Sequence, residues 1–209
     1  AIGMYSMCLN TTGSDNVAIG RCTLVANLTG VSNTAIGYGA LRVNSGGNNN
    51  LAMGTSASLG KTTCTTDVAL GAVTLTGNSN VAIGASALWC NLAGCFNTAI
   101  GQQALYNNLG SNNLAIGFCS MQANTTGQHN FALGAWALAV NTGGSYNTAI
   151  GFCALYSNIN ATCNIAIGAY ALKSNTVGTG NIAVGANALC LNQTGNYNFA
   201  AGTQALLCN

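Results

Sequence analysis

Very few side chains in this sequence could perform acid–base chemistry. His129 is the only histidine, Asp15 and Asp67 are the only acidic residues, and glutamate is absent. Two acids cannot build the oxygen cage that binds calcium, and a glycoside-hydrolysing carboxylate pair would need both in one place. Any catalytic interpretation therefore depends on whether the fold brings these three residues within hydrogen-bond reach.

The chain is almost uncharged. Only 3% of its 209 residues are charged, whereas an average soluble domain carries about 25%. The hydrophobic fraction of 49% and the net charge of +2 exclude disorder by charge repulsion. The longest apolar run, Phe131 to Val140, is far shorter than the roughly 20 residues of a membrane span. A nucleic-acid surface is excluded because the only cations are four scattered side chains: Arg21, Arg42, Lys61 and Lys173.

A short repeat accounts for the whole chain. The triplet Ala-Ile-Gly, or a close variant, begins thirteen times, and ten of the twelve spacings are 17 residues, with one of 13 and one of 16. Numbered from its Ala, the unit reads A-I-G-x-x-A-L-x-x-N-T-x-G-x-x-N-T. The units begin at Ala1, Ala18, Ala35, Ala52, Ala69, Ala82, Ala99, Ala115, Ala132, Ala149, Ala166, Ala183 and Ala200.

A unit of this length fits one coil of a solenoid. It is too short for a helix pair or a propeller blade, which need about 33 residues or more. Positions 15 to 2 predict one strand, as in Asp15 to Ile19, and positions 5 to 9 predict a second, as in Gln103 to Asn107. We therefore expect residues 1–209 to form one all-β domain, a parallel β-solenoid of about 13 coils, excerpted from a longer fibrous chain.

Period-2 alternation predicts which positions face inward. Positions 17 and 2 are mostly aliphatic, and position 7 is Leu or Met in every unit except at Ser58. These three positions are expected to form the interior. Position 8 varies from Arg42 to Trp89 and Lys173, which is typical of an exposed site.

Position 1 is always Ala and position 3 is always Gly, and both are expected to face outward. Uniformly small outward residues predict that another backbone packs on this face, most economically an identical chain. The alternative explanation is that the backbone of a single coil requires small residues at these two positions. The predicted interface residues are Ala18, Gly20, Ala35, Gly37, Ala99, Gly101, Ala149, Gly151, Ala166 and Gly168.

Asparagine dominates two positions of the unit. Position 10 is Asn in most units, with a gap at Lys61, and position 16 is Asn in all complete units except one, where Asp67 replaces it. Stacked amides can hydrogen-bond the copies above and below them. The predicted structural ladder at position 16 consists of Asn16, Asn33, Asn50, Asn80, Asn97, Asn113, Asn130, Asn147, Asn164, Asn181 and Asn198.

The reactive residues belong to coils that are far apart, which argues against catalytic activity. His129 belongs to the eighth coil and Asp67 to the fourth, a separation of about 19 Å at the strand spacing of a sheet. Neither a catalytic dyad nor a triad can form within one chain at that distance. His129 is therefore expected to be a turn residue.

The ten cysteines allow few bridges. A disulfide needs Cα atoms within about 7 Å, so only Cys190–Cys208, Cys90–Cys95 and Cys153–Cys163 are candidates, with Cys8–Cys22 marginal. Cys64 and Cys119 have no cysteine on a neighbouring coil. No Cys-x-x-Cys occurs, so zinc is not expected. Some cysteines are expected to fill small apolar spaces, and the redox compartment stays undecided.

Several large aromatic residues are expected at the surface. Scattered surface aromatics ordinarily pack on neighbouring side chains, although they can also stack on sugars. The residues concerned are Trp89, Tyr106, Trp136 and Tyr156.

Three segments resemble a known kind of repeat. They are Asn33 to Leu41 (NTAIGYGAL), Asn97 to Asn108 (NTAIGQQALYNN) and Asn147 to Asn158 (NTAIGFCALYSN). They are similar to repeats of phage-type tail fibres and, more distantly, to the shorter N-S-V-A-I-G head repeats of trimeric autotransporter adhesins. The resemblance covers all 209 residues. It implies a trimer of left-handed parallel β-rolls, with the A-I-G strand near the trimer axis, in a fibre that reaches or binds a cell surface.

The functional expectation is a non-enzymatic fibre segment, the shaft or head of a virus tail fibre or cell-surface adhesin. It would lie outside the cell or on a cell or virion surface, without a cofactor. Its partners would be further copies of itself, in a homotrimer or an end-to-end filament, and a glycan or protein receptor. One alternative is a self-assembling extracellular filament. Ice binding ranks last, because position 17 mixes Thr with Val, Leu, Phe and Ile and is expected to point inward.

Overall fold

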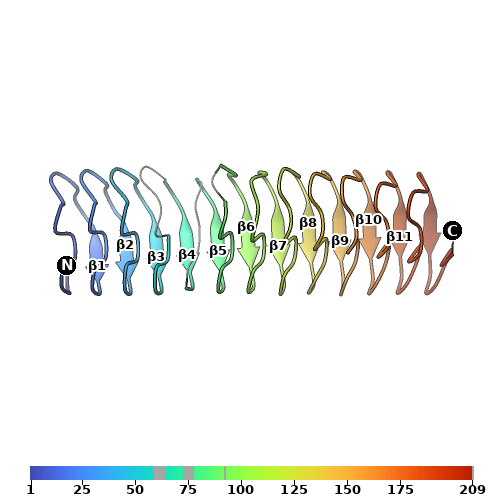
Figure 1. Ribbon diagram of the computed structural model, residues 1–209, viewed down its shortest axis with the longest axis horizontal. Coiled ribbons are helices and arrows are strands. Elements are labelled where there is room, and N and C mark those ends of the chain that lie inside the picture. Colours follow the sequence, from blue (N-terminus) through green and yellow to red (C-terminus); the bar gives the residue numbers. More distant parts are fainter. Residues whose placement is uncertain (59–64, 73–77, 92, 209) are drawn as a thin grey trace.

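The protein is an all-β solenoid, which confirms the expected fold class. The computed structural model describes residues 1–58, 65–72, 78–91 and 93–208. Lys61, Cys64 and most of the shortened turn after Ala69 lie outside these residues. Successive coils stack side by side into one straight rod with the termini at opposite ends (Figure 1).

Every unit after the first contributes one short strand to a single parallel sheet of twelve strands in chain order, and the first unit joins the sheet through an isolated bridge from Ile2 to Ile19. The pairing is in register, so that Ala149 of one coil lies opposite Ala166 of the next. The strands are β1 (Val17–Ile19), β2 (Thr34–Ile36), β3 (Leu51–Met53), β4 (Val68–Leu70), β5 (Val81–Ile83), β6 (Thr98–Ile100), β7 (Leu114–Ile116), β8 (Phe131–Leu133), β9 (Thr148–Ile150), β10 (Ile165–Ile167), β11 (Ile182–Val184) and β12 (Phe199–Ala201).

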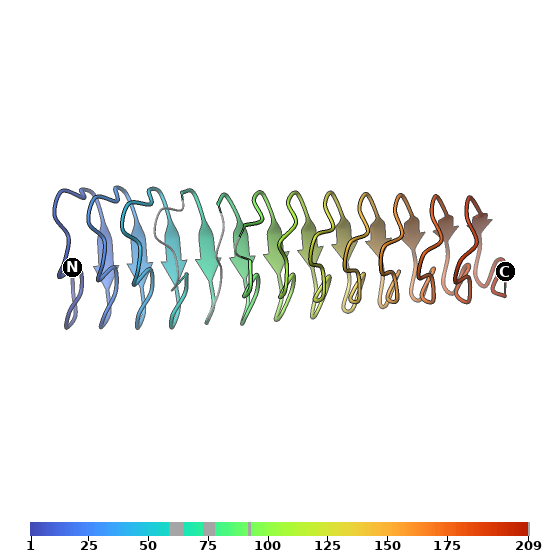
Figure 2. The ribbon, with the colours of Figure 1, turned by 45° about the horizontal axis from the view of Figure 1, so that its top comes forward.

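The second strand predicted at positions 5 to 9 does not form in the coils that the structure describes at these positions. This segment is a turn in which positions 5 and 7 have positive φ, as at Cys153 (54°) and Leu155 (50°). Hydrogen bonds between coils nevertheless continue through it, since the Cys153 N–H donates to Ala135 on one side and the Leu155 N–H donates to Ala171 on the other. The inter-coil hydrogen bonds therefore continue around the coil, although strands form on only one side of it (Figure 2).

The assignment of the strand faces was wrong. Position 1 points inward, and the predicted interface residues Ala18, Ala35, Ala99, Ala149 and Ala166 are all buried inside their own coils. Positions 17 and 2, expected inside, flank each buried Ala and lie on the outer side of the sheet. Alternation identifies the residues that share a face, but it does not say which face is inside. The return segment lies so close to the sheet that a methyl group fills the space between them.

The core consists of small residues and, in most coils, one leucine. Position 7 is interior as expected, and Leu24, Leu105 and Leu189 are completely buried. They pack in one cluster with the alanines of position 1 and the alanines of position 6, such as Ala104 and Ala188. The interior is therefore a narrow column rather than a broad apolar core.

Glycine at position 3 is explained by the next coil of the same chain. Gly151 has a φ of +131°, and a Cβ added there would lie 2.6 Å from the carbonyl carbon and oxygen of Gly168. The predicted interface glycines Gly20, Gly37 and Gly101 meet the following coil in the same way. The alternative of a constraint within the chain thus accounts for these glycines, and no second chain is needed.

The asparagines of position 16 form a continuous ladder inside the solenoid. Each side-chain Oδ1 accepts a hydrogen bond from the backbone N–H of the same position in the next coil, at 2.8–3.1 Å, from Asn16 through to Asn198. Asp67 fits this ladder because its Oδ1 accepts from the Asn80 N–H in the same manner. The Nδ2 group donates to the position 13 carbonyl of the next coil, as from Asn147 to Ala161 at 2.8 Å.

The asparagines of position 10 form a second buried ladder. Here the Nδ2 group donates both to the Oδ1 of the preceding coil and to the position 13 carbonyl of its own coil, as from Asn141 to Asn124 (2.7 Å) and to Gly144 (2.9 Å). The same bonds link Asn10, Asn27 and Asn44, and they link the successive position 10 residues from Asn108 to Asn192. The two ladders hold the turn of each coil to the next one.

Replacing Asn147 by Ala tests the position 16 ladder. The change leaves the buried Asn164 N–H without its side-chain acceptor and removes one of the two side-chain donors to the Ala161 carbonyl, which keeps only Asn158. Because each unsatisfied buried group costs about 1–3 kcal/mol, we expect a clear fall in the urea midpoint of unfolding. The matched control is Asn107→Ala at an exposed position, which should change stability by less than about 0.5 kcal/mol. Equal midpoints for the two variants would contradict the structural role of the ladder.

Candidate functional site

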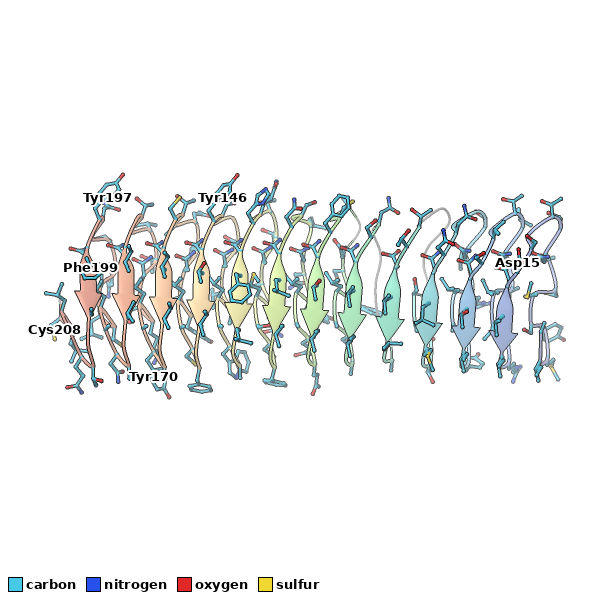
Figure 3. All side chains as sticks on the ribbon, turned by 180° about the vertical axis from the view of Figure 1, so that it is seen from behind. Asp15, Tyr146, Tyr170, Tyr197, Phe199 and Cys208 are labelled. Atoms are coloured by element: carbon cyan, nitrogen blue, oxygen red, sulfur yellow. The ribbon has the colours of Figure 1, made fainter. Side chains whose placement is uncertain are left out.

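The outer sheet face is a regular surface that runs along all twelve strands. We use this name for the outward side chains of positions 17 and 2 on β1–β12. The strands lie side by side along one side of the rod, and Figure 3 shows this side with Phe199 at its C-terminal end. Position 2 is apolar in all thirteen units, and position 17 is apolar in nine of twelve.

The outer sheet face is apolar although it is open to solvent in a single chain. Ile19, Met53, Leu133 and Ile167 each expose about 40% of their surface. Position 4, which is also outward, varies freely from Arg21 to Gln102 and Phe118. A surface that stays aliphatic from coil to coil while its neighbour varies is typical of an interaction surface.

The dimensions of the outer sheet face follow from sheet geometry. Twelve strands about 4.8 Å apart, with three residues each, cover a rectangle about 58 Å long and 10 Å wide, or about 600 Å². Two such faces in contact would bury about 1,200 Å², which is the lower end of the range for specific protein interfaces. The face is therefore large enough for a stable association with a second copy.

The ice-binding alternative must be judged on this same face, since position 17 points outward and not inward as expected. Only Thr34, Thr98 and Thr148 place a hydroxyl there, among nine aliphatic or aromatic residues. The face thus has a regular spacing but no continuous threonine array.

The three acid–base residues lie apart in the structure as well as in the sequence. His129 is exposed in the turn before β8, and its ring stacks on Tyr146 with centroids 5.0 Å apart. Asp15 is exposed and accepts a hydrogen bond from the Ser14 hydroxyl. Asp67 is buried in the position 16 ladder. The structure does not bring these three residues together.

The described residues hold neither a candidate metal cluster nor a membrane-spanning helix. Residues 1–58, 65–72, 78–91 and 93–208 contain no group of three or more His, Cys, Asp or Glu side chains that could hold a metal ion. Within the same ranges, no helix is long and apolar enough to cross a membrane.

The three candidate disulfides are absent, and all six of their cysteines are free thiols. Cys153 belongs to the position 5 corner and Cys163 to the position 15 corner. Figure 3 shows that these corners lie on opposite edges of the rod, where Tyr170 and Tyr146 mark them. Cys190 is buried whereas Cys208 is exposed in the last coil.

Sequence reasoning missed a cluster of aromatic side chains. It lies along the edge of the rod that unit positions 4 to 8 form, which we call the position 4 to 8 edge. Trp136 contacts Phe118 edge to face at 5.3 Å and lies 6.3 Å from Tyr156, measured between ring centroids. Phe152 contacts Tyr170 edge to face at 5.3 Å. The signal in the sequence was the alternation of large and small residues at positions 4 and 5 over successive units.

No protein-family model, no curated protein and no solved structure matches this chain. The resemblance of the repeats to tail-fibre and adhesin sequences therefore has no support from these comparisons.

The thiol of Cys153 provides a test of the arrangement on the position 4 to 8 edge. Burial raises the pKa of Cys153, and the positive charge of Lys173 partly opposes that rise. Because the thiolate is the reactive form, alkylation of Cys153 should be slow at neutral pH and should accelerate as the pH rises. Lys173→Met should move the Cys153 profile to still higher pH and leave unchanged the profile of Cys119, whose pKa is raised by burial alone. Peptide mapping after iodoacetamide treatment measures both sites, and identical Cys153 profiles with and without Lys173 would contradict the described arrangement.

Proposed function

We propose that this chain is a rigid segment of an extracellular attachment fibre and performs no catalysis. The observation that carries the proposal is the unbroken coil-to-coil ladder at position 16, from Asn16 to Asn198. A chain in which every coil bonds the next in register behaves as a stiff rod, since each repeat contacts only its neighbours. Such a rod suits a shaft that holds a binding tip away from a cell or virion surface.

The outer sheet face gives the fibre its means of association. We place the contact between copies on positions 17 and 2, in place of the Ala and Gly positions predicted from the sequence. Burial of about 600 Å² of apolar surface per copy would contribute substantially to association at roughly 25 cal/mol per Å². Three parallel copies around a common axis form the arrangement that the resemblance to tail fibres implies.

Two other forms of assembly lead to different masses. A pair of copies meeting face to face would be a closed dimer with two-fold symmetry. The self-assembling filament, in which copies stack end to end, would give an open-ended series of masses. The homotrimer is the state we propose, and native mass spectrometry distinguishes all three.

Charged substitutions on the outer sheet face test the proposed association. The triple variant Ile83→Lys, Ile116→Lys and Ile150→Lys places three cations on side chains that point away from the coil interior. We expect the unsubstituted chain to be a trimer and the triple variant to be a monomer, because burying unpaired charges at an interface is costly. The circular dichroism spectrum should be unchanged.

The control adds a charge to a different surface. Gln102→Lys lies at the exposed position 4 next to β6 and should leave the mass of the assembly unchanged. A monomeric unsubstituted chain, or a triple variant that still assembles, would contradict association through the outer sheet face.

A further inference from the structure

The aromatic cluster arises from a two-coil alternation at positions 4 and 5. A large ring at position 4 accompanies a small residue at position 5, and the next coil reverses the order. Each coil therefore carries one ring, and the rings meet edge to face in two adjacent pairs, Phe118 with Trp136 and Phe152 with Tyr170. The four successive pairs are Phe118–Cys119, Ala135–Trp136, Phe152–Cys153 and Ala169–Tyr170.

A hollow opens where the small Cys153 side chain lies among these rings. Its volume is about 370 Å³, and it is lined by Trp136, Phe152, Cys153, Tyr156 and Lys173. This volume lies near the lower end of the range for small-molecule sites, about 300 to 1,000 Å³. Tyr170 projects at this edge of the rod, beyond the carboxyl ends of the strands and away from Tyr146 and Tyr197 (Figure 3).

The lining suits a ligand that is apolar on one face and polar at its rim. Trp136 and Tyr156 present rings that are only half-buried, while the Tyr hydroxyl and the Lys173 ammonium supply polar groups at the same place. A pyranose ring has this character, because its axial C–H groups form apolar faces and its hydroxyls lie around the edge. C–H groups of such a ring can contact an aromatic face favourably.

Lys173 gives the hollow a positive charge, which favours an anionic ligand. It is the only charged side chain between residue 68 and residue 209, and its ammonium lies 5.3 Å from the centroid of the Tyr170 ring. The nearest acid along the rod, Asp67, is seven coils away, about 34 Å at the sheet spacing. No carboxylate side chain of the same chain can therefore neutralise Lys173.

We propose that this hollow binds a carboxylate-bearing sugar of an acidic polysaccharide. One pyranose ring stacks on Trp136 and Tyr156, and its carboxylate pairs with the Lys173 ammonium. The site is separate from the outer sheet face and does not depend on fibre association. A single-stranded nucleic acid would also stack on aromatic rings, but its phosphates need a positively charged groove, and one lysine does not provide one.

Calorimetric titration of the intact chain with defined polymers tests the proposal. The probes are polygalacturonate, alginate, hyaluronate and polysialic acid, together with methyl-esterified polygalacturonate as the uncharged counterpart of the first. We expect at least one of the acidic polymers to bind, and the esterified form of polygalacturonate to bind more weakly than the acid. Added salt should weaken binding of the acidic form, since the charge contact is screened.

Two pairs of variants separate the site from general surface effects. Trp136→Ala should weaken binding about tenfold or more, as expected for a central aromatic contact, while Trp89→Ala, on a distant coil, should have no effect. Lys173→Gln should weaken acid binding about threefold, as for a partly exposed ion pair. Arg42→Gln is its control at the same unit position and should leave binding unchanged.

Several outcomes would overturn the proposal. These are failure of all four acidic polymers to bind, equal affinity for the acidic and esterified forms, and full affinity in Trp136→Ala. Tighter binding of an oligothymidylate than of any sugar polymer would assign the hollow to nucleic acid instead. Loss of binding with the assembly mass unchanged concerns this site alone, so its failure and that of the proposed fibre are distinguishable.

Discussion

The hydrogen bond from each position 16 N–H to the asparagine Oδ1 of the preceding coil is the interaction on which the rest of the structure depends. It fixes the register between coils, so that identical positions lie directly above one another. Register in turn places every Gly of position 3 against the next Gly and every Leu of position 7 in one column. A side chain at any position therefore meets its own copies first.

This constraint explains why the chain is almost without charge. A charge repeated at one position would face a like charge about 4.8 Å away, which destabilises a sheet. The six charged residues accordingly occur singly, and no two of the same sign share a position on neighbouring coils. Buried amides satisfy one another without net charge, so asparagine can repeat along the rod where glutamate and lysine cannot. Low charge is thus a consequence of stacking and carries no information about a partner.

The repeat made the solenoid predictable from the sequence. The strand faces, the backbone conformation of the turn and the aromatic cluster were not, because each residue pattern fits more than one arrangement. Spacing alone predicted one coil per unit and the asparagine stacking, because a 17-residue period allows few other folds. Alternation could not decide whether Ala149 or its neighbours Thr148 and Ile150 face inward, and hydrophobicity favoured the wrong side since the coil is too thin for large residues. The positive φ of Cys153 and Leu155 left no trace in residue type. The aromatic cluster was visible only as an alternation over pairs of units, although Trp136 and Tyr156 were identified as surface aromatics.

Hydrogen exchange at the backbone N–H groups of position 16 tests the central account most directly. From Asn97 to Asn181 this N–H donates to a buried asparagine side chain of the preceding coil. These backbone N–H groups should exchange slowly and at similar rates. A backbone N–H that points into solvent should exchange fast. Fast exchange at Asn130, Asn147 and Asn164 in the folded chain would show that the ladder does not hold the coils in register.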